Sequence, residues 1–143
     1  MRISDRVQAM QNSPIRKFNP MADAAEAAGV KIYHLNIGQP DIETPSVFWE
    51  AVKGFDQKVL AYAGSWGLPE LQDAIVDYFK RFDMNLERND VLITAGGSEA
   101  LTLTFLSIIN PGDEVIVAEP YYTNYLTFIQ AADGVVKTRY NIR

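Results

Sequence analysis

The sequence predicts an α/β fold in which a mostly parallel sheet is flanked by helices, and three observations support this prediction. Short apolar runs with the length of buried strands occur at residues 91–94, 114–118 and 135–140. Mostly apolar stretches that predict helices separate these runs, at residues 98–109 and 123–132. The links between them are short, and all except the link at residues 119–122 contain glycine. This alternation predicts parallel strands joined by right-handed crossovers, with helices over both faces of the sheet.

The residues before this alternation predict a short helix and a short strand. Residues 21–28 are rich in alanine and acidic residues and are followed by Gly29, which predicts a helix that ends at a glycine. Apolar and polar residues alternate over residues 33–37, the pattern of a half-buried strand. Residues 38–41 contain a glycine and a proline and predict a turn after that strand.

Two more helices are expected before the first strand of the sheet. Ser46 is predicted to cap a helix that extends to about Gly54. Residues 62–67 predict a loop, and Pro69 suits the first turn of the helix that follows. Apolar residues at helical spacing support that helix, at Leu71, Ala74, Ile75, Tyr78, Phe79 and Phe82.

The composition is that of a globular protein and excludes several kinds of site. Of the 143 residues, 48% are hydrophobic and 22% are charged. The absence of cysteine excludes disulfides, thiolate zinc sites and cysteine nucleophiles. A net charge of −5 with scattered basic residues argues against nucleic acid or a membrane as a partner. No apolar run is long enough to span a membrane and the start is no signal peptide, so we expect a cytoplasmic protein.

The turn formed by Gly96, Gly97 and Ser98 is the first candidate site. A helix N-terminus leaves its first N–H groups unpaired and carries a partial positive charge, and glycines before it let a phosphate approach the backbone. Ser98 could add its hydroxyl to the same anion. On local chemistry alone, a tight strand-to-helix turn with Ser98 as the N-cap explains these residues equally well. The spacing matches neither a P-loop nor the dinucleotide-binding fingerprint.

Two further segments have the position that a ligand site requires. Tyr122 follows the carboxyl end of a predicted strand, where ligands bind in open α/β sheets, and its ring could stack on a flat ligand. Gly38 could let backbone N–H groups approach a carboxylate. Taken singly, packing explains Tyr122 better and an ordinary turn explains Gly38 better. Nothing in the sequence around Tyr62 marks it by itself as a functional residue. The single histidine, His34, has neither a nucleophile elbow nor metal-ligand spacing around it, so no metal site is expected.

Four segments nevertheless occur together in a familiar order and spacing. From about Pro14 to its end the chain resembles the class I and II aminotransferases, fold type I enzymes that use pyridoxal phosphate. This resemblance implies that residues 1–45 form an N-terminal arm with the edge of a small domain. It implies that residues 46–143 form the first part of the cofactor-binding large domain. The segments that carry the resemblance are residues 35–45, 62–71, 93–101 and 110–125.

The resemblance also implies a role for each candidate residue that binds the cofactor phosphate. Gly97 and Ser98 match the backbone and hydroxyl donors to that phosphate, and Gly96 matches the residue that permits the turn. Tyr62 matches the tyrosine that reaches the cofactor phosphate of the neighbouring subunit. A two-fold homodimer with active sites built from both chains follows from that last role.

The ring and the substrate have matching positions as well. Tyr122 matches the aromatic residue that stacks on the pyridine ring of pyridoxal phosphate. Gly38 matches the backbone contact to the α-carboxylate of the substrate, an amino acid or a 2-oxo acid. Gln72 departs from the family, which usually has arginine there, and we interpret it as a tolerated change on a helix surface.

The larger departure concerns the lysine that binds the cofactor. In the family this Schiff-base lysine lies far downstream, so no catalytic residue is assigned in this chain. We expect the chain to be truncated and, by itself, inactive, because the cofactor's chemistry cannot be organised without that lysine. None of its own lysines stands in the matching context: Lys17, Lys31, Lys53, Lys58, Lys80 and Lys137.

For the parent protein, the resemblance implies an aminotransferase that moves an amino group between an amino acid and a 2-oxo acid. Carbon–sulfur lyases, aminocyclopropane-carboxylate synthases and fused transcription regulators share these N-terminal segments and stay open as alternatives. A non-catalytic module that dimerises or binds a phosphate ligand is a third possibility. The amino-acid substrate does not follow from these residues.

Overall fold

A computed structural model describes residues 2–10 and 13–140 of the chain. The chain divides into two compact units. Unit 1 consists of Met1–Gly38 and Ala95–Arg143, and unit 2 consists of Gln39–Thr94. The division into an arm at 1–45 and a large-domain part at 46–143 stays a prediction.

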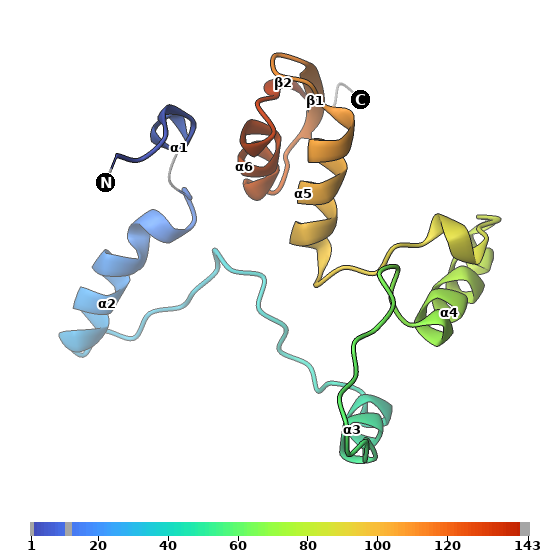
Figure 1. Cartoon of the computed structure of the whole chain (residues 1–143). Coiled ribbons are helices and arrows are strands. Elements are labelled where there is room, and N and C mark those ends of the chain that lie inside the picture. The colour runs from blue at the N-terminus through green and yellow to red at the C-terminus, as the bar shows by residue number, and fades with distance from the viewer. Residues whose placement is uncertain (1, 11–12, 141–143) are drawn as a thin grey trace. The chain divides into compact units, whose positions relative to one another are not determined.

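The centre of unit 1 is a parallel strand pair with a helix between its strands. Strand β1 (Glu114–Glu119) pairs in parallel with β2 (Val135–Tyr140), so that Glu114 lies opposite Val135. Parallel neighbours need a crossover connection, and helix α6 (Asn124–Ala131) provides it and packs against β2 (Figure 1). The predicted strands and helix of this region are confirmed, with bounds that differ by one residue.

Helix α5 (Gly97–Ile108) precedes β1 and packs against α6 (Figure 1). The core of this unit centres on Ile129 of α6, whose side chain is fully buried. Gly134 follows α6 so closely that a Cβ atom there would lie 2.8 Å from Ile129 Cγ2. Packing therefore requires the glycine after α6, while the left-handed backbone conformation at the end of this helix belongs to Asp133, with φ 59°.

The sheet differs from the prediction in its number of strands and in its covering. Residues of β1 alternate between exposed and half-buried, and Ile116 is 70% exposed, so within unit 1 one face of this strand lies open. The first of the three expected strands, at 91–94, does not form in the described structure. The N–H of Ile93 donates instead to the backbone oxygen of Trp66 (3.0 Å). An apolar run becomes a strand only beside a hydrogen-bonding neighbour, which the run itself does not specify.

The predicted strand at residues 33–37 is also wrong. The described backbone is irregular there, and the N–H of Leu35 donates to the carbonyl oxygen of Tyr33 (3.1 Å), which closes a tight turn. Leu35 is 94% exposed, so the alternation in the sequence does not correspond to a buried face. Alternation is a weak signal when no paired strand provides the ladder.

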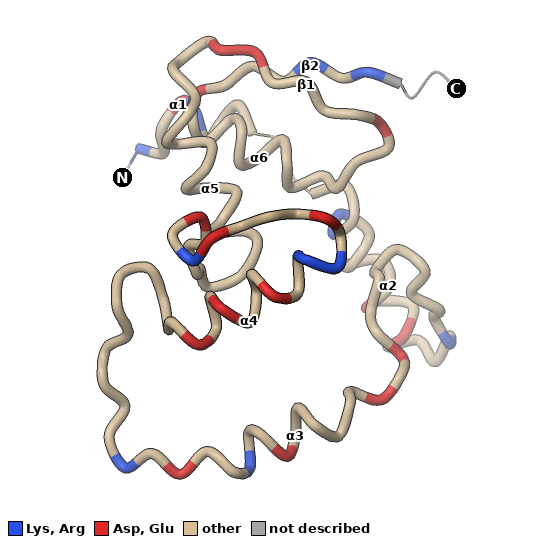
Figure 2. Tube along the Cα trace, turned by 90° about the vertical axis from the view of Figure 1, so that its right-hand side faces the viewer, with Lys and Arg blue, Asp and Glu red and all other residues tan. Residues whose placement is uncertain are grey.

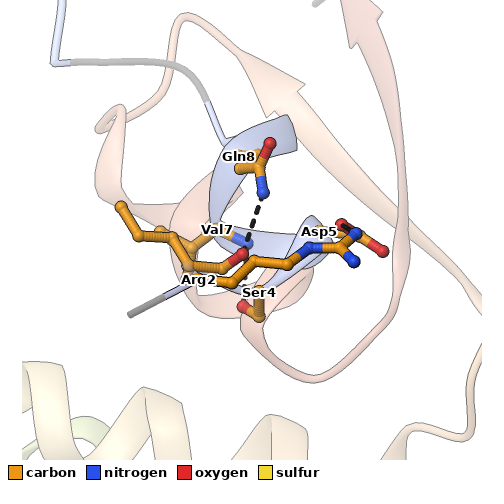
Figure 3. A network of polar contacts seen from close by, with 6 residues as sticks. Arg2, Ser4, Asp5, Val7 and Gln8 are labelled. Carbon is orange, nitrogen blue, oxygen red and sulfur yellow. Dashed lines mark hydrogen bonds and ion pairs between the residues drawn. The ribbon is translucent and has the colours of Figure 1, made fainter.

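The chain begins with a short capped helix, α1 (Asp5–Ala9), shown in Figure 3. Ser4 is its N-cap, and the Ser4 hydroxyl accepts a hydrogen bond from the N–H of Val7 (3.3 Å). The amide of Gln8 donates back to the carbonyl oxygen of Ile3 (2.8 Å; Figure 3). The Ser4 hydroxyl thereby satisfies an N–H group that the first turn leaves unpaired, and the Gln8 amide holds the residue before the N-cap.

Ion pairing attaches this first helix to the end of α6. The guanidinium of Arg6 donates to both carboxylate oxygens of Asp133, at 2.8 and 2.7 Å. A 3₁₀ turn, η1 (Arg16–Phe18), then leads into α2 (Asn19–Ala27). The residue Gly29, with φ +84°, follows that helix, so the predicted helix with a glycine stop is confirmed.

Unit 2 contains two helices and two 3₁₀ turns. Helix α3 (Ser46–Lys53) starts at Ser46, and Pro45 rather than Ser46 is its N-cap, without a side-chain capping bond. The predicted cap is therefore wrong, because Ser46 already has helical backbone geometry. Helix α4 (Pro69–Phe79) begins with its proline as predicted and continues into η2 (Lys80–Phe82). The second 3₁₀ turn is η3 (Arg88–Asp90).

The interpretation of Gln72 as a tolerated change on a helix surface is wrong, because the residue is buried. Its side chain is only 5% exposed, and its amide donates to the backbone oxygens of Val91 (2.6 Å) and Arg88 (3.3 Å). A buried polar side chain is retained only where its hydrogen bonds are made. Gln72 is therefore an internal connection between α4 and the segment that follows η3.

Charged side chains do not gather in one segment of the described chain. Figure 2 shows Lys and Arg distributed along the tube among Asp and Glu. The described residues contain no group of three or more His, Asp or Glu side chains that could hold a metal ion. Among the described helices, none has the length and apolar character needed to cross a membrane.

Candidate functional site

The turn before α5 has the conformation that its glycines predict. Gly96 is the N-cap, with φ 97° and ψ 171°, a backbone region that is essentially restricted to glycine. Gly97 is the first helical residue. A Cβ atom at either position would meet no described atom within 4 Å. Gly96 is therefore required by backbone conformation, while the space in front of the helix stays open.

Ser98 is the second residue of α5 and not its N-cap, so the capping explanation for this serine is wrong. The side chain is exposed, and its hydroxyl has no hydrogen-bond partner among the described residues. The N–H groups of Gly97 and Ser98 lie in the first turn, where a helix offers no acceptor. Three donors thus lie together at the positive end of a helix dipole.

An acidic side chain stabilises this turn from within. The carboxylate of Glu99 accepts a hydrogen bond from the N–H of Ala95 (2.6 Å). A carboxylate in the first turn also interacts favourably with the helix dipole. Glu99 therefore holds the residue before the glycines, and the donors of Gly97 and Ser98 remain for an external anion. A phosphate fits this donor set, because backbone N–H groups and a hydroxyl are its usual ligands at a helix N-terminus.

A second site of unit 1 brings Gly38 and Tyr122 together. They line a common pocket of about 660 Å³, a size suited to a small molecule. The pocket lies between residues from the start of the chain and the loop that joins β1 to α6. The remaining lining residues are Ser13, Ile15, Arg16, Asn19, Asn36, Ile37 and Asn124.

Tyr122 is held in place through its neighbours in the chain. Its hydroxyl accepts a hydrogen bond from the side-chain amide of Asn124 (2.8 Å). Its ring meets that of Tyr125 edge to face, with centroids 5.8 Å apart. Since 52% of Tyr122 stays exposed, the side chain is supported but can still contact a ligand. An aromatic ring held in this manner can stack on a flat heterocycle.

Asn36 connects the two chain segments that form the pocket. Its side-chain amide donates to the backbone oxygen of Ile15 (3.1 Å), which holds the N-terminal residues against the segment that contains Gly38. Sequence reasoning missed Asn36, Arg16 and Asn124 as pocket residues. Their proximity follows only from the fold, because no local motif marks the residues around Arg16.

Tyr62 belongs to unit 2 and lies in the predicted loop, whereas the other candidate residues belong to unit 1. It is fully exposed, at 105% of the reference value. Its exposure is shared by neighbouring apolar residues such as Val59 (75%) and Leu60 (79%) and does not by itself indicate a function. The structure leaves its role in a neighbouring subunit as a prediction.

Two close contacts in unit 2 involve residues 88–93, which precede the glycine turn in the sequence. Gly67, with φ +105°, is so close to Ile93 that a Cβ atom there would lie 2.3 Å from Ile93 Cγ1. Arg88 forms a bidentate ion pair with Asp73, with its Nε 2.7 Å from Oδ1. Hydrogen bonding to Arg88 lowers the pKa of Asp73 below its ordinary value, and the same bond raises the pKa of Arg88.

Comparison with known proteins shows a consistent family. The family model described as aminotransferase class I and II matches residues 30–143. The aspartate/prephenate aminotransferase of Thermus thermophilus is 37% identical over 136 residues, covering 94% of this chain and 35% of that protein. The aspartate aminotransferase of Pyrococcus horikoshii is 35% identical over 134 residues, covering 92% of this chain and 33% of that protein.

Solved structures agree with the sequence comparison. The alanine aminotransferase from Pyrococcus furiosus superimposes with a TM-score of 0.91 at 34% identity, covering 99% of this chain and 37% of that one. An aspartate aminotransferase of Thermus thermophilus gives a TM-score of 0.89 at 36% identity, covering 99% and 38%. The chain therefore spans about a third of the length of the curated relatives that it matches. Its fold is that of the first part of a fold type I aminotransferase.

Proposed function

Because the chain belongs to the family of class I and II aminotransferases, we propose that the protein containing it transfers an amino group between an amino acid and a 2-oxo acid with pyridoxal phosphate as cofactor. When bound, that cofactor stabilises the carbanion formed at the substrate's α-carbon. The proposal rests most directly on the open helix N-terminus at Gly97 and Ser98, which supplies donors for the cofactor phosphate.

Each candidate residue has a distinct task in this proposal. Gly97 and Ser98 bind the phosphate, and Gly96 provides the backbone conformation that exposes their N–H groups. Tyr122 supports one face of the pyridine ring. Gly38 offers its backbone N–H to the substrate α-carboxylate. The common pocket of Gly38 and Tyr122 supports the last two assignments, because ring and substrate must lie next to each other.

The proposal includes a cytoplasmic homodimer in which Tyr62 contacts the cofactor phosphate of the neighbouring subunit. The full exposure of Tyr62 leaves its side chain free to contact a neighbouring subunit. In a two-fold dimer each subunit supplies this tyrosine to the other, so both sites are completed together. Loss of cofactor affinity in Tyr62→Ala, rescued by mixing with subunits that carry Ser98→Ala, would support a site shared between chains.

The first experiment measures binding of pyridoxal phosphate by equilibrium dialysis. We expect Ser98→Ala to weaken binding at least about tenfold, the effect of one lost hydrogen bond to a charged group. The matched control is Ser107→Ala on the same helix, whose hydroxyl donates to the carbonyl oxygen of Leu103 (2.7 Å) and faces no proposed ligand. Equal affinities for both variants would contradict the phosphate assignment.

The second experiment measures amino transfer. The protein is incubated with pyridoxal phosphate, a panel of amino-acid donors and 2-oxo acid acceptors, and the new amino acid is quantified by chromatography. We expect transfer by the full protein and none by the 143-residue chain alone. Release of sulfide from cysteine without amino transfer would favour the carbon–sulfur lyase instead. Cofactor binding without any turnover would favour the non-catalytic module.

A further inference from the structure

Tyr122 adjoins two open spaces in unit 1. It lines the pocket that it shares with Gly38, and it also lines a second pocket of about 540 Å³. Packing therefore restricts its side chain little, in agreement with its exposure of 52%. A ring that stacks on a ligand binds more weakly if it must first be ordered, because immobilising a side chain costs entropy. The contacts that order this ring before binding are therefore part of the site.

We propose that Asn124 is a positioning residue that holds the ring of Tyr122 in one place before the cofactor binds. The side-chain amide of Asn124 donates a hydrogen bond to the hydroxyl of Tyr122 at 2.8 Å. The inference rests on the proposed function, because it takes Tyr122 as the support of the pyridine ring. Asn124 acts through Tyr122 in this role and needs no contact with the cofactor.

Helix α6 fixes the position of the Asn124 amide. Asn124 is the first residue of this helix, and the fully buried side chain of Ile129 anchors the helix in the core of unit 1. The N–H of Tyr125 donates to the carbonyl oxygen of Tyr122 (3.0 Å), so the hydrogen-bonding side chains belong to one closed turn. The Tyr122 side chain is thus attached at its backbone and at its hydroxyl, which leaves its ring few orientations.

The ring of Tyr125 restrains Tyr122 in a different manner. The two rings meet at 88°, with centroids 5.8 Å apart. This packing contact does not involve the hydroxyl of Tyr122. A hydrogen bond is directional and weakens steeply when its angle or distance changes. The bond from Asn124 therefore determines where the hydroxyl lies, and Tyr125 supports the ring that the bond has placed.

The first test is a double-mutant cycle in the full protein. Asn124→Leu removes the donor and keeps a side chain of similar size, while Tyr122→Phe removes the acceptor and keeps the ring. We expect each change to weaken binding of pyridoxal phosphate about three- to tenfold, as for one lost hydrogen bond, and the double variant to bind like either single variant. Thr127→Val, at an exposed position of α6, is the control and should bind like the unmodified protein.

The second test needs no cofactor. In protein with isotope-labelled tyrosine, NMR relaxation of the ring carbons reports the mobility of each ring on the picosecond-to-nanosecond timescale. The signal that disappears in Tyr122→Phe identifies the ring of Tyr122. We expect the mobility of this ring to rise in Asn124→Leu. It should return toward its original value in Asn124→Asp, whose carboxylate can accept a hydrogen bond from the same hydroxyl.

Two results would overturn the assignment. Unchanged mobility of the Tyr122 ring in Asn124→Leu would show that the ring is ordered without Asn124. A loss of cofactor affinity in Asn124→Leu that persists in the Tyr122→Phe background would show that Asn124 acts through the start of α6 or on the ligand itself. Failure of the proposed function has a different signature. A protein that binds no pyridoxal phosphate, but whose Tyr122 ring loosens in Asn124→Leu, would retain the positioning role and remove the cofactor.

Discussion

The side-chain amide of Gln72 donates a hydrogen bond of 2.6 Å to the backbone oxygen of Val91. Gln72 is buried in α4, and Val91 is itself one of the few buried residues of unit 2. The same amide also donates to Arg88. Because an amide has two N–H donors, one side chain can satisfy both backbone oxygens, and this accounts for a polar residue at a buried position.

We expect Gln72→Ala to lower the free energy of unfolding by about 1–3 kcal/mol, since the buried oxygen of Val91 loses its donor. Urea unfolding followed by tryptophan fluorescence measures this loss. Gln57→Ala serves as the control, because Gln57 belongs to the same unit and is exposed. If the two alanine variants are equally stable, Gln72 has no internal role.

Gly67 should tolerate no side chain. Its φ of +105° is unfavourable for other residues, and a Cβ atom would lie 2.5 Å from Ile93 Cβ as well as against Ile93 Cγ1. We expect Gly67→Ala to cost at least about 2 kcal/mol from strain and overpacking combined. Gly64→Ala is the matched control in the same loop, because its Cβ would make only an ordinary contact at 3.6 Å. Comparable unfolding midpoints for the two variants would contradict the close approach.

The two glycines before Ser98 should respond differently to alanine. Gly96→Ala is expected to destabilise the protein by about 1–3 kcal/mol, because its φ of 97° and ψ of 171° strain any residue with a Cβ. The same change should weaken binding of pyridoxal phosphate, since the turn can no longer present its N–H groups. Gly97→Ala keeps its N–H, is helical and has open space around the new methyl group. Thermal unfolding should therefore find Gly97→Ala close to the unmodified protein, and a loss of stability as large as that of Gly96→Ala would contradict the open space around Gly97.

The pair of Asp73 and Arg88 predicts a specific dependence of stability on pH. The pKa of Asp73 is lowered in the folded protein, first by its hydrogen bond from Arg88. Its contribution is therefore present above the unfolded pKa of about 3.9 and is lost as the pH falls through the lowered folded value. We expect Asp73→Asn to reduce the urea midpoint at pH 7 and to have no such effect once the pH is below the folded pKa of Asp73.

Arg88→Gln tests the same pair from its other side. Because both variants remove one interaction, each should lower the midpoint at pH 7, and the double variant should add little to either. Additive losses would show that the two residues act independently.

Periodicity and punctuation predicted the second half of unit 1 well. The segments that became α5, β1, α6 and β2 are long enough for their pattern to show, and glycine or proline marks their ends. The segment at residues 91–94 is too short for its pattern to distinguish a strand from another buried segment. Their apolar character reports burial, as Val91 confirms, but the acceptor of the Ile93 N–H is Trp66 and no strand is present.

The site was predictable only where residues matched a family pattern. The conformation of Gly96 agrees with its assigned part in the turn, and Gly38 and Tyr122 share a pocket although they are far apart in the chain. Arg16 could not be found in this way, because its place in the pocket depends on the fold that brings residues 13–19 to Tyr122 and Asn124. Gln72 was misjudged since a helical pattern shows which face is polar but not which polar residue meets a backbone oxygen.

The parallel strand pair of unit 1 has a consequence for how the chain folds. Strands β1 and β2 and the helix between them all lie within residues 114–140, and partners in the ladder, such as Glu114 and Val135, are 21 residues apart. The entropy of loop closure must therefore be overcome before the ladder stabilises the segment, and parallel pairing of this kind forms slowly. We expect the amides of β1 and β2 to gain protection in the same phase of pulsed hydrogen exchange. Protection of one strand before the other would contradict this expectation. Because β2 is the last element of this segment, the ladder can form only after the chain has been synthesised through Tyr140.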